Sequence, residues 1–137
     1  MQIANVGAVL RDLPAETARR IKVVFVTTDP GRDSGERLRS WLGAIHPRIV
    51  GLRGPLEEVN AAESALLLPR SVVEPPHGEA RHGEPASYFV GHATPVVVFS
   101  ADGLARRMYP AGVRQQDWRR DLPRLVAEAD AARPTGS

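Results

Sequence analysis

Hydrophobic residues follow two patterns along the chain, one at the 3.6-residue spacing of a helix and one in short continuous runs. The helical spacing predicts helices at residues 1–20, 34–45, 55–68 and 115–132. The short runs predict strands at residues 22–27, 48–54, 71–73 and 88–90, and a β-hairpin over residues 94–112. Because strands alternate with helices before the hairpin, this order predicts one α/β sandwich, with a mixed central sheet flanked by helices. We expect a single domain over residues 1–132 and a disordered tail over residues 133–137.

Local residue chemistry sets several of the predicted boundaries. Ser34 is expected to cap the helix that follows it, and Pro55 to stand in a first helical turn, where its missing N–H costs little. The sequence Ala-Asp-Gly at residues 101–103 supplies a turn for the hairpin. Pro123 is expected to kink the C-terminal helix or to divide it in two.

Large apolar side chains define the predicted core. The run VVFV at residues 23–26 is typical of a strand that is buried on both faces. Trp41, Trp118, Val96 and Phe99 are all expected to be core residues.

Composition excludes several classes of function. Lys22 is the only lysine among 18 basic residues, and the arginines are interspersed with acids, which argues against a nucleic-acid interface. The chain has no cysteine, so these residues contain no disulfide, no thiol nucleophile and no thiolate metal site. Within these residues the sequence predicts neither a membrane span nor a signal peptide.

The four histidines carry different predictions. His92 stands three residues before Pro95, and its imidazole is either a copper ligand or a hydrogen-bonding group at the entrance of a strand. His77 and His82 share a segment with three glutamates, but their spacing matches no standard metal site, so a solvated loop is favoured. His46 is expected to cap the C-terminus of a helix.

Two further candidates have both a functional and a structural interpretation. Asp29 and Asp33 could form a carboxylate pair for acid–base chemistry, but the sequence DPGRDS favours turn and N-cap roles. Pro95 could adopt the cis form, or it could be a trans proline at the first residue of a strand.

Two segments resemble the Sco/SenC family of copper chaperones. VVFVTTDPGRDSGERLRSWL is similar to the family's strand, D-P-x-R-D-T motif and helix, and it matches the motif at Asp29, Pro30, Arg32 and Asp33. HATPVVVFSADG is similar to the family's H-S-x-x-x-Y-L-I-D-P-x-G motif, and it aligns His92 with the family's histidine. The segment IVGLRGPLEEVNAAESAL resembles the family's middle region, so the resemblance covers nearly the whole chain.

The resemblance implies a thioredoxin-like fold and one copper ion, bound by two cysteines of a C-x-x-x-C-P motif and by His92. It places Asp29 near the metal end of the domain, and Pro95 at the position of the cis-proline of thioredoxins. It implies a role in assembling the copper site of cytochrome c oxidase, with the copper-bearing subunit of that enzyme as partner. Members of the family are held outside the cytoplasmic membrane by an N-terminal anchor.

This sequence departs from the family pattern because the cysteine pair would fall just before Met1. The family's strand that leads to those cysteines lies between two others, which are residues 23–26 and 95–99 here. Without it, both strands would leave backbone groups unpaired, at about 1–3 kcal/mol for each buried group. We therefore expect the sequence to be a fragment or to start at an internal methionine, and the exposed sheet centre to favour self-association.

Three functional hypotheses follow. The first is a Sco/SenC-type copper chaperone that lacks its cysteine ligands. The second is a truncated thiol–disulfide or peroxide-reducing protein of thioredoxin-like fold, which would not need His92. The third is a non-catalytic interaction domain. In all three cases the 137 residues alone are expected to have no thiol redox activity and not to act as an enzyme.

Overall fold

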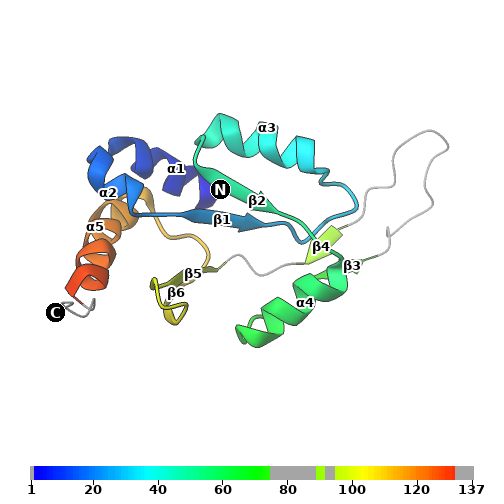
Figure 1. Cartoon of the computed structure of the whole chain (residues 1–137). Coiled ribbons are helices and arrows are strands. Elements are labelled where there is room, and N and C mark those ends of the chain that lie inside the picture. The colour runs from blue at the N-terminus through cyan, green and yellow to red at the C-terminus, as the bar shows by residue number, and fades with distance from the viewer. Residues whose placement is uncertain (1, 75–88, 92–94, 132–137) are drawn as a thin grey trace.

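The computed structural model of the chain describes residues 2–74, 89–91 and 95–131 (Figure 1). The helices in these residues are α1 (Gln2–Asp12), α2 (Ala15–Arg19), α3 (Gly35–Ile45), α4 (Leu56–Ala65) and α5 (Gln115–Ala131). The strands are β1 (Val23–Val26), β2 (Ile49–Leu52), β3 (Val72–Glu74), β4 (Phe89–Gly91), β5 (Val96–Phe99) and β6 (Ala105–Tyr109). The predicted α/β order is confirmed, and the predicted tail at residues 133–137 lies outside the described ranges.

Two prolines, Pro14 and Pro123, bear on the helix predictions. The predicted helix at residues 1–20 is two helices, because Pro14 has an extended backbone (φ −51°, ψ 135°) and serves as the N-cap of α2. Pro123 was expected to kink the last helix or to divide it in two, and of these the division does not occur, because α5 runs through Pro123 as one element. Trp118 and Leu122 of α5 are buried, and their packing holds this helix in place despite the missing N–H. None of the helices in the described part of the chain is long and apolar enough to cross a membrane.

The hydrophobic core lies between the first and last helices. α1 and α5 contribute its fully buried members, which are Val6, Val9, Leu10, Trp118 and Leu122. The rings of Tyr109 and Trp118 lie 4.5 Å apart, so strand β6 is attached to the same cluster. Val23 at the start of β1 and Val96 at the start of β5 also pack against it. One cluster therefore holds the beginnings of two strands that are far apart in the sequence.

The strands form three pairs and not one continuous sheet among the described residues. β1 pairs with β2 in parallel, whereas β3 pairs with β4 and β5 with β6 in antiparallel fashion. Figure 1 shows β1, and not β2, on the side of the pair that faces the β5–β6 hairpin. No described strand pairs with the second edge of β1 or with the second edge of β5.

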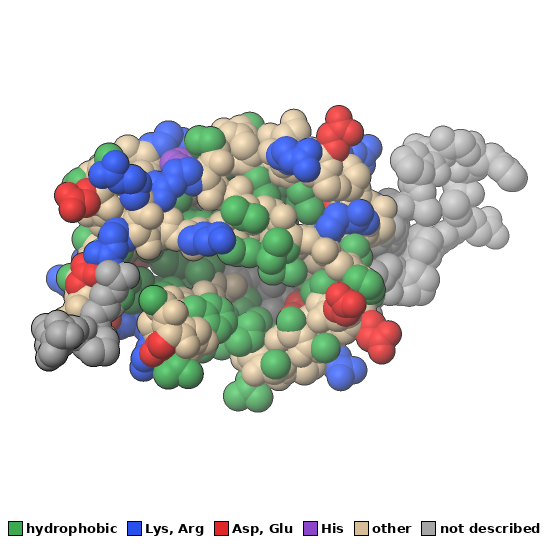
Figure 2. All heavy atoms as spheres, viewed as in Figure 1, with side chains coloured by type: hydrophobic (Ala, Val, Ile, Leu, Met, Phe, Trp, Pro, Cys, Tyr) green, Lys and Arg blue, Asp and Glu red, His purple; other side chains and the backbone are tan. Residues whose placement is uncertain are grey.

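Helix α3 covers one face of the β1–β2 pair and leaves the other face bare. Leu38 and Leu42 of α3 are buried against the sheet, where a Cβ on Gly51 would lie only 2.8 Å from Leu42 Cδ1. The bare face carries four half-exposed aliphatic side chains, those of Val24, Val26, Val50 and Leu52. Figure 2 shows hydrophobic side chains gathered around a hollow between this pair and the β5–β6 hairpin.

For two of the four predicted core residues, Phe99 and Trp41, the prediction of burial is wrong, and the reason is the same. Phe99 is 50% exposed and Trp41 is 37% exposed, whereas Trp118 is buried and Val96 is partly buried against the core. Phe99 belongs to a strand with no described partner on one edge. Trp41 of α3 packs edge-on against Phe25 of β1, with ring centroids 5.2 Å apart. Both side chains stay exposed because nothing in the described structure covers them.

The contact between α1 and the end of α3 depends on Gly7. A Cβ on Gly7 would lie 2.5 Å from Ile45 Cγ2, whereas a Cβ on Gly43 of α3 meets nothing within 4 Å. We expect Gly7→Ala to lower the free energy of unfolding by about 1–3 kcal/mol because the two helices must move apart. Gly43→Ala is the matched control and should raise it by roughly 0.5–1 kcal/mol through better helix propensity. Denaturant unfolding measures both, and equal effects would contradict the close contact.

Candidate functional site

The loop after β1 is built around a buried hydroxyl group. Thr27 is 1% exposed, and its N–H donates to the carbonyl of Leu52 at the end of β2. Its hydroxyl donates to Asp33 Oδ2 and accepts from the N–H of Asp29 at 3.0 Å. One side chain thus holds both ends of the loop at the carboxyl end of a parallel strand, which is where α/β proteins place binding residues.

The two candidate carboxylates have structural partners, as the turn interpretation predicted. Asp29 pairs with Arg32, with 2.5 Å between Oδ2 and Nε, and it also accepts from the Arg32 N–H at 3.3 Å. Asp33 accepts from Thr27, and the N-cap of α3 is Ser34, whose side chain accepts from the N–H of Arg37 at 3.2 Å. Both carboxylates thus hold the loop together through contacts between neighbouring residues.

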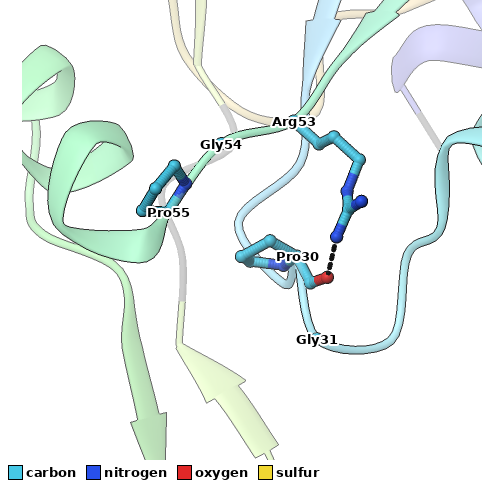
Figure 3. Close-up of a pocket in the computed structure, with 5 residues that line it drawn as sticks. All are labelled: Pro30, Gly31, Arg53, Gly54 and Pro55. Carbon is cyan, nitrogen blue, oxygen red and sulfur yellow. Dashed lines mark hydrogen bonds between the residues drawn. The ribbon is translucent and has the colours of Figure 1, made fainter.

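A cavity of about 470 Å³ lies between this loop and the segment that follows β2 (Figure 3). It is lined by Pro30, Gly31, Arg53, Gly54 and Pro55. Figure 3 shows the Arg53 guanidinium reaching across it to the carbonyl oxygen of Pro30, with a donor–acceptor distance of 2.8 Å. Among the described residues that line it there is one cation, Arg53, and no carboxylate, imidazole or hydroxyl side chain.

His46 is the one histidine that the structure describes, and it has the predicted capping role. Its N–H donates to the Leu42 carbonyl at the end of α3, and its Nδ1 accepts from the N–H of Arg48 at 3.2 Å. Burial lowers the pKa of His46, and the positive charges of Arg11 and Arg48 lower it further. The side chain is therefore a neutral structural group near pH 7.

The residues that the family motif singles out are only partly described. His92 lies outside the described residues, as do His77 and His82 and the peptide bond that joins Thr94 to Pro95. Pro95 itself is partly buried and comes directly before β5, which matches a proline at the entrance of a strand. Among the described residues no three histidine or acidic side chains come together as a metal site. The donors that the structure does describe therefore do not fit copper.

Sequence reasoning missed a second buried polar contact, between α4 and the start of β3. Glu63 accepts hydrogen bonds from both the N–H and the hydroxyl of Ser71, each at 2.7 Å, and Asn60 Oδ1 accepts from the same N–H at 3.0 Å. Glu63 and Ser71 are both buried. The only signal was a glutamate at a helical position that should otherwise be apolar, and this signal is weak without knowledge of its partner.

Comparison with known proteins identifies the family. The sequence profile of the SCO1/SenC family matches residues 1–127, so the chain belongs to this family. It is 28% identical over 114 residues to a Stutzerimonas stutzeri protein whose name provisionally assigns it copper binding. It is also 28% identical over 109 residues to the human mitochondrial SCO2 homolog. These matches cover 83% and 79% of this chain but only 52% and 38% of the two relatives, so the chain spans about half of their length or less.

Solved structures confirm the fold. The chain superposes on the copper-bound crystal structure of yeast Sco1 with a TM-score of 0.70, covering 98% of this chain and 69% of that one at 21% identity. Copper-bound ScoI of Arabidopsis thaliana gives a TM-score of 0.66 over 93% of this chain and 74% of that one, at 17% identity. The thioredoxin-like α/β architecture that the motifs implied is thereby confirmed.

Replacing the Thr27 hydroxyl tests whether it holds the loop. Thr27→Val keeps the shape but removes the hydrogen bonds to Asp29 and Asp33, so we expect the free energy of unfolding to fall by about 1–3 kcal/mol. Thr27→Ser keeps the hydroxyl, so its free energy of unfolding should fall less than that of Thr27→Val. Denaturant unfolding measures both variants, and a Thr27→Val protein as stable as the original would show that the loop does not depend on this group.

The lowered pKa of His46 predicts a specific dependence of stability on pH. The folded protein resists protonation of His46, whereas in the unfolded chain this side chain titrates near its ordinary pKa of 6.5. Its contribution is therefore complete above that pH and is lost as the pH falls through the lower pKa of the folded state. His46→Asn keeps an acceptor for the Arg48 N–H but cannot titrate. We expect its free energy of unfolding to fall less between about pH 7.5 and pH 5.5 than that of the original protein; equal losses would contradict the assignment.

Proposed function

We propose that this chain is the folded part of a copper-delivery protein that assembles the copper site of cytochrome c oxidase. The observation that carries the proposal is the family match over residues 1–127, which includes the segment around His92. Structures with bound copper in two relatives of the same fold support it. The copper-bearing subunit of the oxidase is the proposed partner. The proposed location is outside the cytoplasmic membrane, or in the corresponding compartment of a mitochondrion.

In this proposal His92 supplies one copper ligand, and Asp29 and Pro95 lie beside the site. Imidazole binds copper well, but one imidazole alone does not hold the ion tightly. The chain has no cysteine, so it lacks the thiolate donors that favour Cu(I). We therefore propose that two thiolates come from polypeptide outside residues 1–137, and that these residues are part of a longer protein.

The chemistry of this function is transfer of an ion and not catalysis of a reaction. Thiol–disulfide exchange, the alternative role for this fold, would need the same two thiolates but would not need His92. No feature of the described structure favours that alternative. The loop at the end of β1 would need only to hold its shape while the ion is bound and released.

Copper titration followed by NMR tests the role of His92. Adding Cu(II) in small steps to the 137-residue chain should broaden the ring-proton signals of His92 before those of His77 and His82, because the bound ion is paramagnetic. His92→Ala should abolish the first broadening step, and His82→Ala is the matched control that should leave it unchanged. Broadening of His77 and His82 first, or an unchanged titration in His92→Ala, would count against the proposal.

The mass of the native protein tests whether these residues are part of a longer protein that supplies the two thiolates. Intact-mass measurement of the protein isolated from its source should give a value above the mass of these 137 residues, with the difference accounting for a segment that contains two cysteines. A native mass equal to that of the 137 residues would reject this source of thiolates, and it would leave His92 without the partners that tight copper binding needs.

A further inference from the structure

The strand pair β3–β4 is too short to hold its own position. Neither strand pairs with any other described strand. The pair is formed by three antiparallel residue pairs, which are Val72–Gly91, Val73–Val90 and Glu74–Phe89. A two-stranded pair by itself is at best marginally stable in water. Contacts from another element must therefore fix where β3 and β4 lie.

Helix α4 supplies such a contact directly before β3. Glu63 lies one turn after Val59 on the buried face of this helix. Its carboxylate accepts from both the N–H and the hydroxyl of Ser71, each at 2.7 Å. Asn60 Oδ1, three residues earlier on α4, accepts from the same N–H at 3.0 Å. Because Glu63 is only 9% exposed and Ser71 only 2%, water does not compete for these hydrogen bonds.

A buried carboxylate is a costly way to attach a strand to a helix. Taking its charge out of water is unfavourable, and both donors of Ser71 are neutral. An apolar contact of the same volume is often as stabilising, but it does not select one position along the strand. The hydrogen bonds of Glu63 do select one. A shift of β3 by one residue would bring Arg70 or Val72 to the carboxylate, and neither has a hydroxyl beside its backbone N–H.

We propose that Glu63 is a positioning residue for the candidate copper ligand. It fixes Ser71, and Ser71 directly precedes Val72, whose partner in the strand pair is Gly91. Gly91 ends β4 and directly precedes His92 in the sequence. A displacement of β3 along α4 therefore displaces the point from which the chain continues to His92. The use of this contact for copper rests on the proposed function, whereas the link from Glu63 to β4 does not.

Hydrogen exchange of the 137-residue chain tests the link to β4 without copper. Glu63→Ala removes both acceptors, so the protected amides of the β3–β4 pair should exchange about tenfold faster or more. The protected amides of the β5–β6 hairpin should keep their rates, which separates local release from a loss of overall stability. Glu57→Ala removes an exposed carboxylate from the first turn of the same helix and is the matched control. Unchanged exchange in β3–β4, or equal acceleration in both strand pairs, would overturn the proposal.

Two milder substitutions keep this test decisive if Glu63→Ala does not fold. Glu63→Gln keeps an acceptor for the Ser71 N–H, so it should restore most of the slow exchange. Asn60→Ala removes only the third acceptor and should accelerate the same amides by a smaller factor than Glu63→Ala. A folded Asn60→Ala protein whose β3–β4 amides exchange as slowly as those of the original would count against the proposal.

Copper binding separates positioning from a purely structural role. In the 137-residue chain His92 is the proposed single ligand, and one ligand needs no alignment with others. Glu63→Ala should therefore leave the Cu(II) broadening of His92 unchanged in this chain. In the longer protein, where two thiolates complete the proposed site, the same substitution should weaken Cu(I) binding by about tenfold or more.

Competition with a chromophoric Cu(I) chelator measures this affinity in the longer protein, and Glu63→Gln should recover most of it. Equal affinity in the original and in a folded Glu63→Ala variant would overturn the positioning role. Failure of His92 to respond to Cu(II) in the unsubstituted 137-residue chain would contradict the proposed function instead, while the exchange result decides the link to β4 by itself.

Discussion

The apolar cluster between α1 and α5 is the constraint on which the rest of the structure depends. It packs two helices from opposite ends of the chain and fixes the first residue of β1 and the first residue of β5. Beyond those two residues the strands leave the cluster, and no described strand joins them. The fold is thus determined at one end by helix packing, while the sheet that would normally form the centre of an α/β domain is incomplete among the described residues.

Local signals in the sequence predicted most of the elements. The cap at Ser34, the hairpin turn before Gly103 and the cap at His46 each depend on a few neighbouring residues, so the sequence contains the whole explanation. The exposure of Trp41 and Phe99 was not predictable in this way. Burial of an apolar side chain depends on what packs over it from elsewhere in the chain, and here the described structure places nothing over either ring.

In the candidate site, too, the contacts between neighbouring residues were predictable and the burial of a side chain was not. The turn chemistry of Asp29 and Asp33 could be predicted from the sequence DPGRDS, because turns are local. The role of Thr27 could not, since a threonine after a strand is common and its importance comes from complete burial between two carboxyl-bearing residues. The assignment of His92 depends on family resemblance alone. The fold of the family can therefore be followed in the described residues, whereas the copper ligand is assigned by resemblance and lies outside them.

The hairpin limits how far strand addition could extend. Between Val98 and Phe99 the register shifts by one residue on β6, which leaves Arg106 as an extra residue opposite no partner. Such a bulge increases the local twist, and Arg106 is tied to Asp102 and Ser100 of the turn. A charged, twisted outer edge is a poor template for a further strand. A sheet therefore grows poorly from the outer edge of the hairpin, and the bulge at Arg106 protects this side of the molecule from seeding a fibre.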